Sequence, residues 1–419
     1  MATRIINSGI KHLEALGNSK FPSLKNIKIV LGRLGNPHLK KLGITVLIGG
    51  TNGKGSVAKS LSTILSSSGY NVGLYTSPHI FKINERIQIN NKNINNNDLN
   101  KALDLIIKNQ NKDDIALSYF EMITTAAIVY FSKMKNDINI FEVGLGGRFD
   151  ATNVIDAKIG IITNISKDHT EYLGNKISEI ASEKAGIIKK NTILITSAKN
   201  KGLKVIKNWS YKKTEKAFIH GIDFKCIKID EIFKYKSEDN IYFKTNLKGS
   251  HQAVNLSLSI KACEVLNEYF NFEIDKNKII KSLKNLKWPA RFQIISRSPD
   301  KILDVAHNVS AIKNLVKNIK NMYPNKKFNV MISMLKDKKA ESCLRILLPH
   351  SKKIYFFDIS HERSIESQFI IDKLNSKKIV KGSENDIEKL LNKNENLLIT
   401  GSIYFVGERF KKYKKIIKI

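Results

Sequence analysis

The sequence has few cysteines and no long hydrophobic run. Cys226, Cys263 and Cys343 are odd in number, lie far apart and form no CxxC pair. They therefore predict neither a disulfide framework nor a cysteine zinc site, and we expect three reduced structural thiols. No stretch approaches the ~20 apolar residues of a membrane span, and the N-terminal residues lack the apolar core of a signal peptide. We expect a cytoplasmic protein that does not bind a membrane.

Acidic residues are also scarce, because 71 Lys and Arg face 38 Asp and Glu, giving a formal net charge of +33. Such an excess would normally suggest a polyanionic partner. The lysines are instead scattered among many asparagines and isoleucines and form no basic stripe with interleaved aromatics, which indicates compositional drift of the genome. We predict no dedicated nucleic-acid partner. The positive potential would still attract small anionic substrates.

Residues 46–56, VLIGGTNGKGS, join a strand-like run to a helix-like segment through a glycine-rich turn. Glycines at 49, 50, 53 and 55 let backbone N–H groups close on an anion, and the helix start and Lys54 add positive charge. Ser56 stands where P-loop proteins hold magnesium. Gly55 separates lysine from serine and Ile48 replaces the leading glycine, so the match to a Walker motif is imperfect. We predict a nucleotide phosphate site, with a structural turn as the alternative.

The hydrophobic periodicity predicts an α/β chain. The 419 residues suffice for two domains. We place the boundary near LKWPARFQ, giving an ATP-binding P-loop domain over 1–289 and a smaller Rossmann-like domain over 290–419. Asp98 is expected to cap a helix over 99–109, and residues 200–245 to form short strands. Further helices are expected at 3–17, 56–69, 119–134, 178–190 and 249–266. Strands are expected at 44–48, 71–75, 86–90, 138–143, 159–163, 301–305, 327–332, 352–357 and 396–400.

Three polar side chains near predicted strand ends or on a helix are candidates for chemistry. Glu142 follows a strand in an apolar context, where a carboxylate is costly unless paired or metal-bound, so we favour a magnesium ligand over a surface charge. His169 also follows a strand, although a lone histidine is more often a hydrogen-bonded core residue. Lys184, in EKAG, would usually be a solvated helix lysine.

Ten motifs occur in one order along the chain: GGTNGKGS, YTSPHIFKINERI, SYFEMITTAA, EVGLGGRFDATN, NISKDH, IASEKAGIIK, GSHQAVN, WPARFQ, DVAHN and GSIYFVGE. Over residues of about 3–408 the chain resembles the bifunctional folylpolyglutamate synthase/dihydrofolate synthase family. This family belongs to the Mur ligase superfamily of ATP-dependent amide-bond-forming enzymes. The resemblance implies a Mur-ligase-like central domain with a P-loop, followed by the Rossmann-like C-terminal domain.

The resemblance also implies roles for individual residues. Lys54, Lys184 and His307 would be catalytic. Lys184 would be carbamylated by carbon dioxide, which requires a neutral amine, so we expect it to be partly buried with a lowered pKa. ATP would contact Asn52, Gly53, Lys54, Gly55, Ser56, Asn255, Arg291 and Asp304. Two Mg²⁺ ions would be held by Ser56, Ser77, Glu142 and His169. The pterin or folate would contact Ser118, Tyr119, Phe120, Glu121, Phe149, Asp150 and Ala151. Glutamate would contact His307 and Ser402.

The implied reaction joins L-glutamate to dihydropteroate, giving dihydrofolate, and to tetrahydrofolate, giving polyglutamates, through an acyl phosphate. A monomer is implied, and the need for a monovalent cation stays open. Two motifs depart from the family, which usually has DGAHNP and WPGR where this chain has DVAHNV and WPAR. Val305 and Val309 should stiffen the loop around His307. The alternatives are another Mur-type ligase acting on a cell-wall nucleotide and a nucleotide-binding module without catalysis.

Overall fold

The computed structural model describes residues 8–17, 23–110, 115–214, 216–238 and 240–419. The chain divides into two compact units. The first contains the residues up to Lys167 together with Leu173–Lys244 and Ala253–Asn285, and the second contains Asp168–Tyr172, Thr245–Gln252 and Leu286–Ile419. Neither unit is continuous in the sequence. The division at 289/290 that the sequence suggests therefore stays a prediction about domains.

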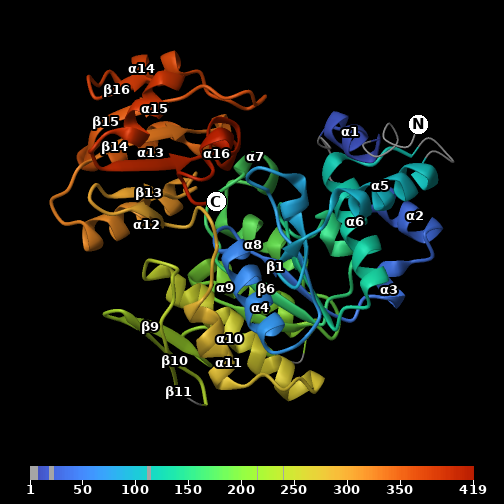
Figure 1. The fold of residues 1–419 in the computed structure, drawn as a ribbon. Coiled ribbons are helices and arrows are strands. Elements are labelled where there is room, and N and C mark those ends of the chain that lie inside the picture. Colours follow the sequence, from blue (N-terminus) through green and yellow to red (C-terminus); the bar gives the residue numbers. More distant parts are fainter. Residues whose placement is uncertain (1–7, 18–22, 111–114, 215, 239) are drawn as a thin grey trace. The chain divides into compact units, whose positions relative to one another are not determined.

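The first unit is built on an eight-stranded sheet with the order β4-β3-β2-β5-β1-β6-β7-β8 (Figure 1). All neighbours from β2 to β8 are parallel, and β3 and β4 add an antiparallel edge. The strands are β1 (Ile44–Gly49), β2 (Val72–Tyr75), β3 (Ile87–Ile89), β4 (Lys92–Asn93), β5 (Ile138–Glu142), β6 (Ile159–Ile162), β7 (Ile193–Thr196) and β8 (Ala217–Ile219). The inner strands are buried and rich in isoleucine, as a parallel sheet covered on both faces requires.

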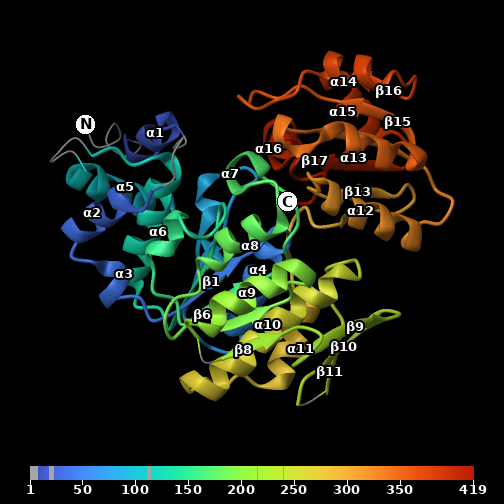
Figure 2. The same cartoon turned by 180° about the vertical axis from the view of Figure 1, so that it is seen from behind.

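Helices pack around this sheet, as the two opposite views show (Figures 1 and 2). One apolar cluster joins Leu13, Ile27 and Leu103 of three helices to Leu47 and Phe141 of the central strands. The helices are α1 (Ser8–Ala15), α2 (Lys25–Arg33), α3 (Pro37–Lys40), α4 (Lys54–Ser67), α5 (Asn96–Gln110), α6 (Tyr119–Met134), α7 (Thr170–Leu173), α8 (Ile177–Ala185), α9 (Asn200–Tyr211), α10 (His251–Phe270) and α11 (Lys276–Lys284). Short 3-10 turns lie at η2 (Ile83–Arg86) and η3 (Ala151–Val154).

Several local predictions are confirmed and two are wrong. The strand before the P-loop, the helix after it and the helix over 119–134 form as expected. The first helix covers Ser8–Ala15, and residues 3–7 of its predicted range lie outside the described residues. Asp98 does not cap α5, because Asn95 Oδ1 accepts the Asp98 N–H at 2.9 Å and Asp98 lies within the first turn. Residues 200–211 are helical, since their apolar side chains recur at helical spacing.

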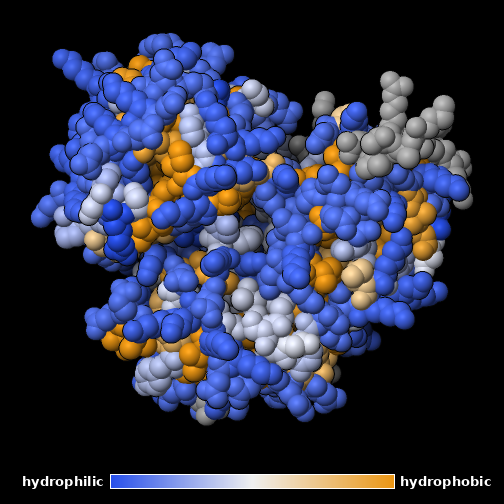
Figure 3. All heavy atoms as spheres, in the orientation of Figure 1, coloured by the Kyte–Doolittle hydropathy of each residue, from blue (hydrophilic) through white to orange (hydrophobic). Residues whose placement is uncertain are grey.

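The rest of that weakly patterned region forms β8 and a separate antiparallel sheet in the order β11-β10-β9. Its strands are β9 (Lys225–Ile229), β10 (Ile232–Lys236) and β11 (Asn240–Phe243). One face packs inward, with Phe233 and Phe243 stacked at 5.4 Å. On β9, Ile227 and Ile229 are about half exposed. Figure 3 shows hydrophobic residues at several places on this face of the molecule.

The second unit contains a six-stranded sheet with the order β12-β13-β17-β14-β15-β16. Only β12 is antiparallel to its neighbour. The strands are β12 (Gln293–Ser296), β13 (Lys301–Leu303), β14 (Phe328–Ser333), β15 (Ser351–Phe356), β16 (Ile379–Lys381) and β17 (Leu397–Gly401). The helices are α12 (Val309–Met322), α13 (Ala340–Leu347), α14 (Ser367–Leu374), α15 (Glu384–Asn392) and α16 (Ile403–Arg409). The four predicted strands are present, and β12 and β16 at the two edges were not predicted.

All three cysteines are buried free thiols, which confirms the prediction made from their spacing. Among the described residues, none of the helices combines the length and the apolar character that crossing a bilayer would take.

Candidate active site

The glycine-rich turn connects β1 directly to the first turn of α4. Gly53 precedes this helix with φ of 89°, and a Cβ there would overlap Asn255 Oδ1. Gly50 has φ of 133°, and a Cβ there would overlap Thr163 Oγ1. Both positions therefore need glycine, for the backbone angle and for space. The turn leads into a helix N-terminus, which offers N–H groups and a positive dipole end to an anion.

Two lysines converge on this turn. Lys54 Nζ donates to the carbonyls of Gly50 and Thr51, at 3.3 Å each. Lys184, from α8, is 5% exposed, and its Nζ donates to the same Gly50 carbonyl at 2.9 Å. The partial burial predicted for Lys184 is therefore observed. A solvated helix lysine is excluded, because the amine lies against the phosphate-type turn.

Residues just after β6 hold the turn in place, and the sequence analysis missed them. The Thr51 N–H donates to the Asn164 carbonyl at 2.8 Å, and the Asn52 N–H donates to Asn164 Oδ1 at 2.9 Å. Thr163 Oγ1 donates to the Asn52 carbonyl at 2.8 Å. The available signal was the polar run that begins NIS where a buried strand ends. These contacts fix the shape of the turn before any ligand binds.

Glu142 stands at the end of β5, next to the strand that leads into the turn. Its register partner on β1 is Ile48, two residues before Gly50. The carboxylate is 6% exposed, and its Oε2 accepts the Ser77 N–H at 3.0 Å. Ser77 follows β2, the other neighbour of β5. The carboxyl ends of three adjacent parallel strands thus gather a P-loop, a buried carboxylate and a serine hydroxyl.

Asn255 is the candidate that α10 supplies to this region. It is 7% exposed, and its side-chain amide lies against Gly53 at the start of α4. The placement follows from the packing of the two helices, because Ser259 Oγ, one turn further along α10, donates to the Val57 carbonyl at 3.1 Å. The structure therefore brings Asn255 to the predicted ATP turn.

The residues expected to contact the pterin carry structural hydrogen bonds. Ser118 caps α6, and Glu121 Oε2 accepts from the Ser118 N–H at 2.9 Å and from its hydroxyl at 2.7 Å. Asp150 is buried and caps η3, where it accepts from Leu145 N and Thr152 N. These hydrogen bonds act to lower the pKa of Asp150, but burial has the larger effect and raises it.

The aromatic members of this set lie close to the strand ends. A Cβ on Gly144, in the turn after β5, would overlap the Phe120 ring, and Phe120 packs 6.2 Å from Tyr75. Tyr119 lies 5.2 Å below the guanidinium of buried Arg86. Phe149 is 48% exposed and Ala151 is buried. Phe120 thus lies beside the turn after β5, and Tyr119 lies against Arg86 at the end of η2.

His169 lies in the second unit, inside a charged cluster, whereas Ser77 and Glu142 lie in the first. Lys338 Nζ lies 2.7 Å from Asp168 Oδ1, 2.8 Å from His169 Nε2 and 3.2 Å from Asp337 Oδ2. Burial works to raise the pKa of Asp168, but the positive charge of Lys338 outweighs it and keeps that pKa below its usual range. Asp168, His169 and Asp337 offer three ligand atoms within 4.8 Å of one another.

The remaining candidates also belong to the second unit. Asp304 accepts the N–H groups of Phe292 and Ala306, and burial raises its pKa to about 6 although Arg291 lies nearby. Burial and Lys338 lower the pKa of His307 to about 4, so its ring is neutral at pH 7. Ser402 is buried and caps α16, where its Oγ accepts the Tyr404 N–H at 3.2 Å.

Comparison with known proteins identifies the family. The Mur ligase middle domain matches residues 48–263, and the glutamate ligase domain of the Mur ligases matches residues 290–403. Over 95% of its length, the chain is 33% identical to the dihydrofolate synthase/folylpolyglutamate synthase of Bacillus subtilis, covering 97% of that protein. The chain belongs to the dihydrofolate synthase/folylpolyglutamate synthase family.

Solved structures agree with this assignment. The Escherichia coli FolC complex with DHPP and ADP is similar with a TM-score of 0.89, at 27% identity over 98% of both chains. The folylpolyglutamate synthase of Thermotoga maritima is similar with a TM-score of 0.84, at 30% identity over the full length of both chains. The predicted fold, with its P-loop Mur ligase domain and Rossmann-like C-terminal domain, is confirmed. The chain is an ATP-dependent ligase.

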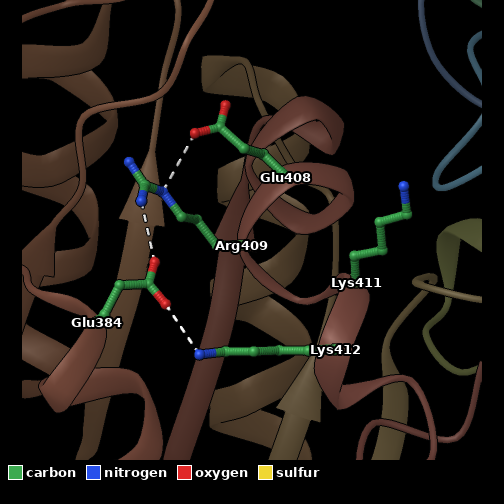
Figure 4. A pocket seen from close by; sticks show the side chains of 5 residues that line it. All are labelled: Glu384, Glu408, Arg409, Lys411 and Lys412. Atoms are coloured by element: carbon green, nitrogen blue, oxygen red, sulfur yellow. Dashed lines mark hydrogen bonds and ion pairs between the residues drawn. The ribbon is translucent and has the colours of Figure 1, made fainter.

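This ligase also has a charged surface pocket whose lining includes none of the predicted site residues. It is lined by Glu384, Glu408, Arg409, Lys411 and Lys412 (Figure 4). Its charges pair with one another, since Arg409 lies 2.9 Å from Glu384 and 3.3 Å from Glu408. Of these five residues, Glu408 belongs to one of the family's motifs, GSIYFVGE, and the other four lie outside them.

The WPAR motif of this ligase places an alanine where the backbone favours glycine. Ala290 is buried and has φ of 57°, in the left-handed region. We expect Ala290→Gly to raise the free energy of unfolding by about 0.5–1 kcal/mol, because relief of the left-handed strain exceeds the added entropy of the unfolded chain. Urea unfolding of both proteins measures this. Ala306→Gly, at a buried alanine outside the left-handed region, is the control and should destabilise; a loss of stability in Ala290→Gly would contradict the prediction.

Proposed function

We propose that this ligase joins L-glutamate to dihydropteroate, forming dihydrofolate, and to tetrahydrofolate, forming folylpolyglutamates, at the expense of ATP. The observation that carries the proposal is the gathering of Lys54, Lys184 and Glu142 at the ends of adjacent parallel strands, around the turn between β1 and α4. The reaction requires the phosphates of ATP, a divalent cation and the carboxylic acid substrate to lie next to one another, and the residues around this turn could hold all three. The names of the relatives support the choice of substrates.

Magnesium fits the residues at this edge of the sheet. The Glu142 carboxylate and the Ser77 and Ser56 hydroxyls are oxygen donors, which magnesium prefers. Glu142 is buried, and its Oε2 accepts the Ser77 N–H. A bound ion would polarise the phosphoryl oxygens of ATP. His169 fits less well as a ligand for a second ion, because Lys338 already donates to its Nε2. We therefore propose one magnesium site here, and a monovalent cation stays open.

The chemistry follows from the poor reactivity of a carboxylate. Transfer of the γ-phosphoryl group of ATP to the acid gives an acyl phosphate, and negative charge builds up on the transferred oxygens. The N–H groups of the turn and Lys54 would hold these oxygens, and Asn255, Arg291 and Asp304 would contact the nucleotide. The glutamate amine then attacks the activated carbonyl carbon, and inorganic phosphate leaves.

Other residues would hold the acid and the amino acid. We propose that Tyr119, Phe120 and Phe149 provide aromatic surface for the pterin. The pterin pocket would be shaped by the backbone at the starts of α6 and η3. Ser118 and Glu121 cap α6, and Asp150 caps η3 just before Ala151. His307, neutral at pH 7, would accept a hydrogen bond from the glutamate ammonium, and Ser402 would be a second contact for glutamate. Carbamylation would convert Lys184 into a carboxylate beside Gly50, able to contribute to the cation site.

The test is glutamate-dependent ADP release by purified protein with ATP and Mg²⁺. We expect release with dihydropteroate and with tetrahydrofolate, and mass spectrometry should show the acid extended by one glutamate. Release with only one acid would assign the enzyme to that single activity. Release only with a cell-wall nucleotide acid, or nucleotide binding without release with any acid, would contradict the proposal in favour of another Mur-type ligase or a non-catalytic module.

A further inference from the structure

We propose that Lys338 is a positioning residue for the DH segment, residues 168–172, and that its ammonium fixes the side chains of Asp168 and His169 relative to each other. The purpose of this positioning rests on the proposed function, because Asp168 also accepts from Asn308, next to His307, which that function places against the glutamate. The contacts that carry the proposal do not depend on it.

One ammonium serves two consecutive side chains. Lys338 Nζ donates to Asp168 Oδ1 at 2.7 Å and to His169 Nε2 at 2.8 Å, and only 4% of the lysine side chain is exposed. Because lysine can only donate, Nε2 must act as the acceptor in this contact. The nitrogen lone pair of His169 is therefore directed at a cation that the protein itself supplies.

The conformation of the DH segment has to be stabilised by contacts such as those of Lys338. Consecutive side chains of an extended strand point to opposite faces, whereas those of Asp168 and His169 meet at one atom. His169 has φ of 50°, in the left-handed region, which is unfavourable for a residue with a Cβ. Asn308 adds a second hold, since its Nδ2 donates to Asp168 Oδ2 at 2.9 Å. The observed geometry is therefore maintained by Asn308, from the DVAHN motif, and by Lys338, from the sequence KDKK at 336–339.

The charges of the cluster balance only with Lys338 present. Asp168 and Asp337 carry two negative charges on side chains that are 8% and 5% exposed. Arg363 lies 3.5 Å from Asp337, and neither oxygen of Asp337 accepts a hydrogen bond from the described residues. Without Lys338, Asp168 would keep the Asn308 amide but lose its ion pair, beside a second buried carboxylate. Repulsion would then move the Asp168 side chain, and His169 would lose its contact with Lys338 while its Nδ1 still faces Asp337 Oδ2 at 3.5 Å.

The experiment compares Lys338→Met, Lys338→Arg and the control Lys336→Met, which removes an exposed lysine from the same turn. Steady-state kinetics, ADP binding by calorimetry and thermal unfolding are measured for each. We expect Lys338→Met to lower kcat about 30-fold while KM for ATP and the affinity for ADP stay within about threefold, since Asp168, His169 and Asp337, which Lys338 contacts, are not among the proposed nucleotide contacts. Lys338→Arg should recover about a third or more of the wild-type kcat, because it still donates hydrogen bonds and carries the charge. Lys336→Met should behave as wild type.

A second measurement does not require activity. In protein labelled with ¹⁵N-histidine, the ring signals of His169 are identified by their loss in His169→Gln. We expect Lys338→Met to shift these signals and Lys336→Met to leave them unchanged. Unchanged His169 signals in Lys338→Met, or a wild-type kcat in that variant, would overturn the proposal. If Lys338→Met does not fold, wild-type-like His169 signals and kcat in Lys338→Arg support it, and the loss of both in a folded Lys338→Arg overturns it. A wild-type protein without ligase activity would refute the proposed function alone, because the signals still report the contact.

Discussion

Replacing Glu142 with glutamine is expected to lower kcat about 1000-fold while the protein stays folded. The carboxylate is buried, accepts the Ser77 N–H and stands beside the P-loop strand. Glutamine keeps the length and the acceptor oxygen but removes the charge. If Glu142 only accepts a hydrogen bond, Glu142→Gln should therefore keep its activity. If Glu142 binds magnesium, the variant should lose its activity. Glutamate-dependent ADP release over a range of Mg²⁺ concentrations, with thermal unfolding, measures both.

Glu85→Gln is the matched control for this experiment. Glu85 is also partly buried, but its carboxylate accepts the backbone N–H groups of Ile80, Phe81 and Lys82. Its replacement should lower the unfolding temperature and leave kcat within about threefold of wild type, since the carboxylate only supports a turn. A Glu142→Gln enzyme with more than about a tenth of wild-type kcat would show that the charge is not needed for the reaction.

Lys184→Ala is expected to lower kcat about 100-fold or more, and acetate should restore part of the lost rate. The side chain is 5% exposed, and its Nζ lies 2.9 Å from the Gly50 carbonyl, so its removal opens a space beside the phosphate turn. If the working form is a carbamate, a small carboxylate can enter this space and replace its charge. Wild-type activity should also fall in buffers depleted of carbon dioxide and return when bicarbonate is added.

Lys189→Ala separates this effect from the loss of a hydrogen-bonded, half-buried lysine. Lys189 Nζ donates to the carbonyls of Asn153 and Ile155, at 2.7 and 2.8 Å. Its replacement should destabilise the protein without any response to acetate. Loss of activity in Lys184→Ala that neither acetate nor bicarbonate affects would assign Lys184 the role of an amine or ammonium, and the carbamate would be rejected.

The sequence could predict the elements whose signals are local. The apolar run before the P-loop, the glycines that need special angles or space, and the helix over 119–134 were all visible as patterns. The strand ends that carry Glu142 and Ser77 followed from the same reasoning. The family resemblance then connected residues far apart in the chain.

Contacts over long sequence distances could not be read from any pattern. Nothing in KDKK indicates that Lys338 meets Asp168, which is 170 residues earlier in the chain. The anchoring of Asn52 by Asn164 likewise depends on which strands become neighbours. The capping error at Asp98 has a different origin, because Asn95 and Asp98 are both good caps and only the start of the helix decides between them.

The discontinuous units have a consequence for anyone who divides this chain. A fragment beginning at Leu286 would lack residues 168–172 and 245–252, which belong to the same compact unit. In this fragment the Lys338 ammonium would lose its ion pair with Asp168. Asn318, against which Gly249 packs, would become exposed. The last third of the protein should therefore be insoluble or unfolded when produced alone, and adding the two missing peptides in trans should rescue it.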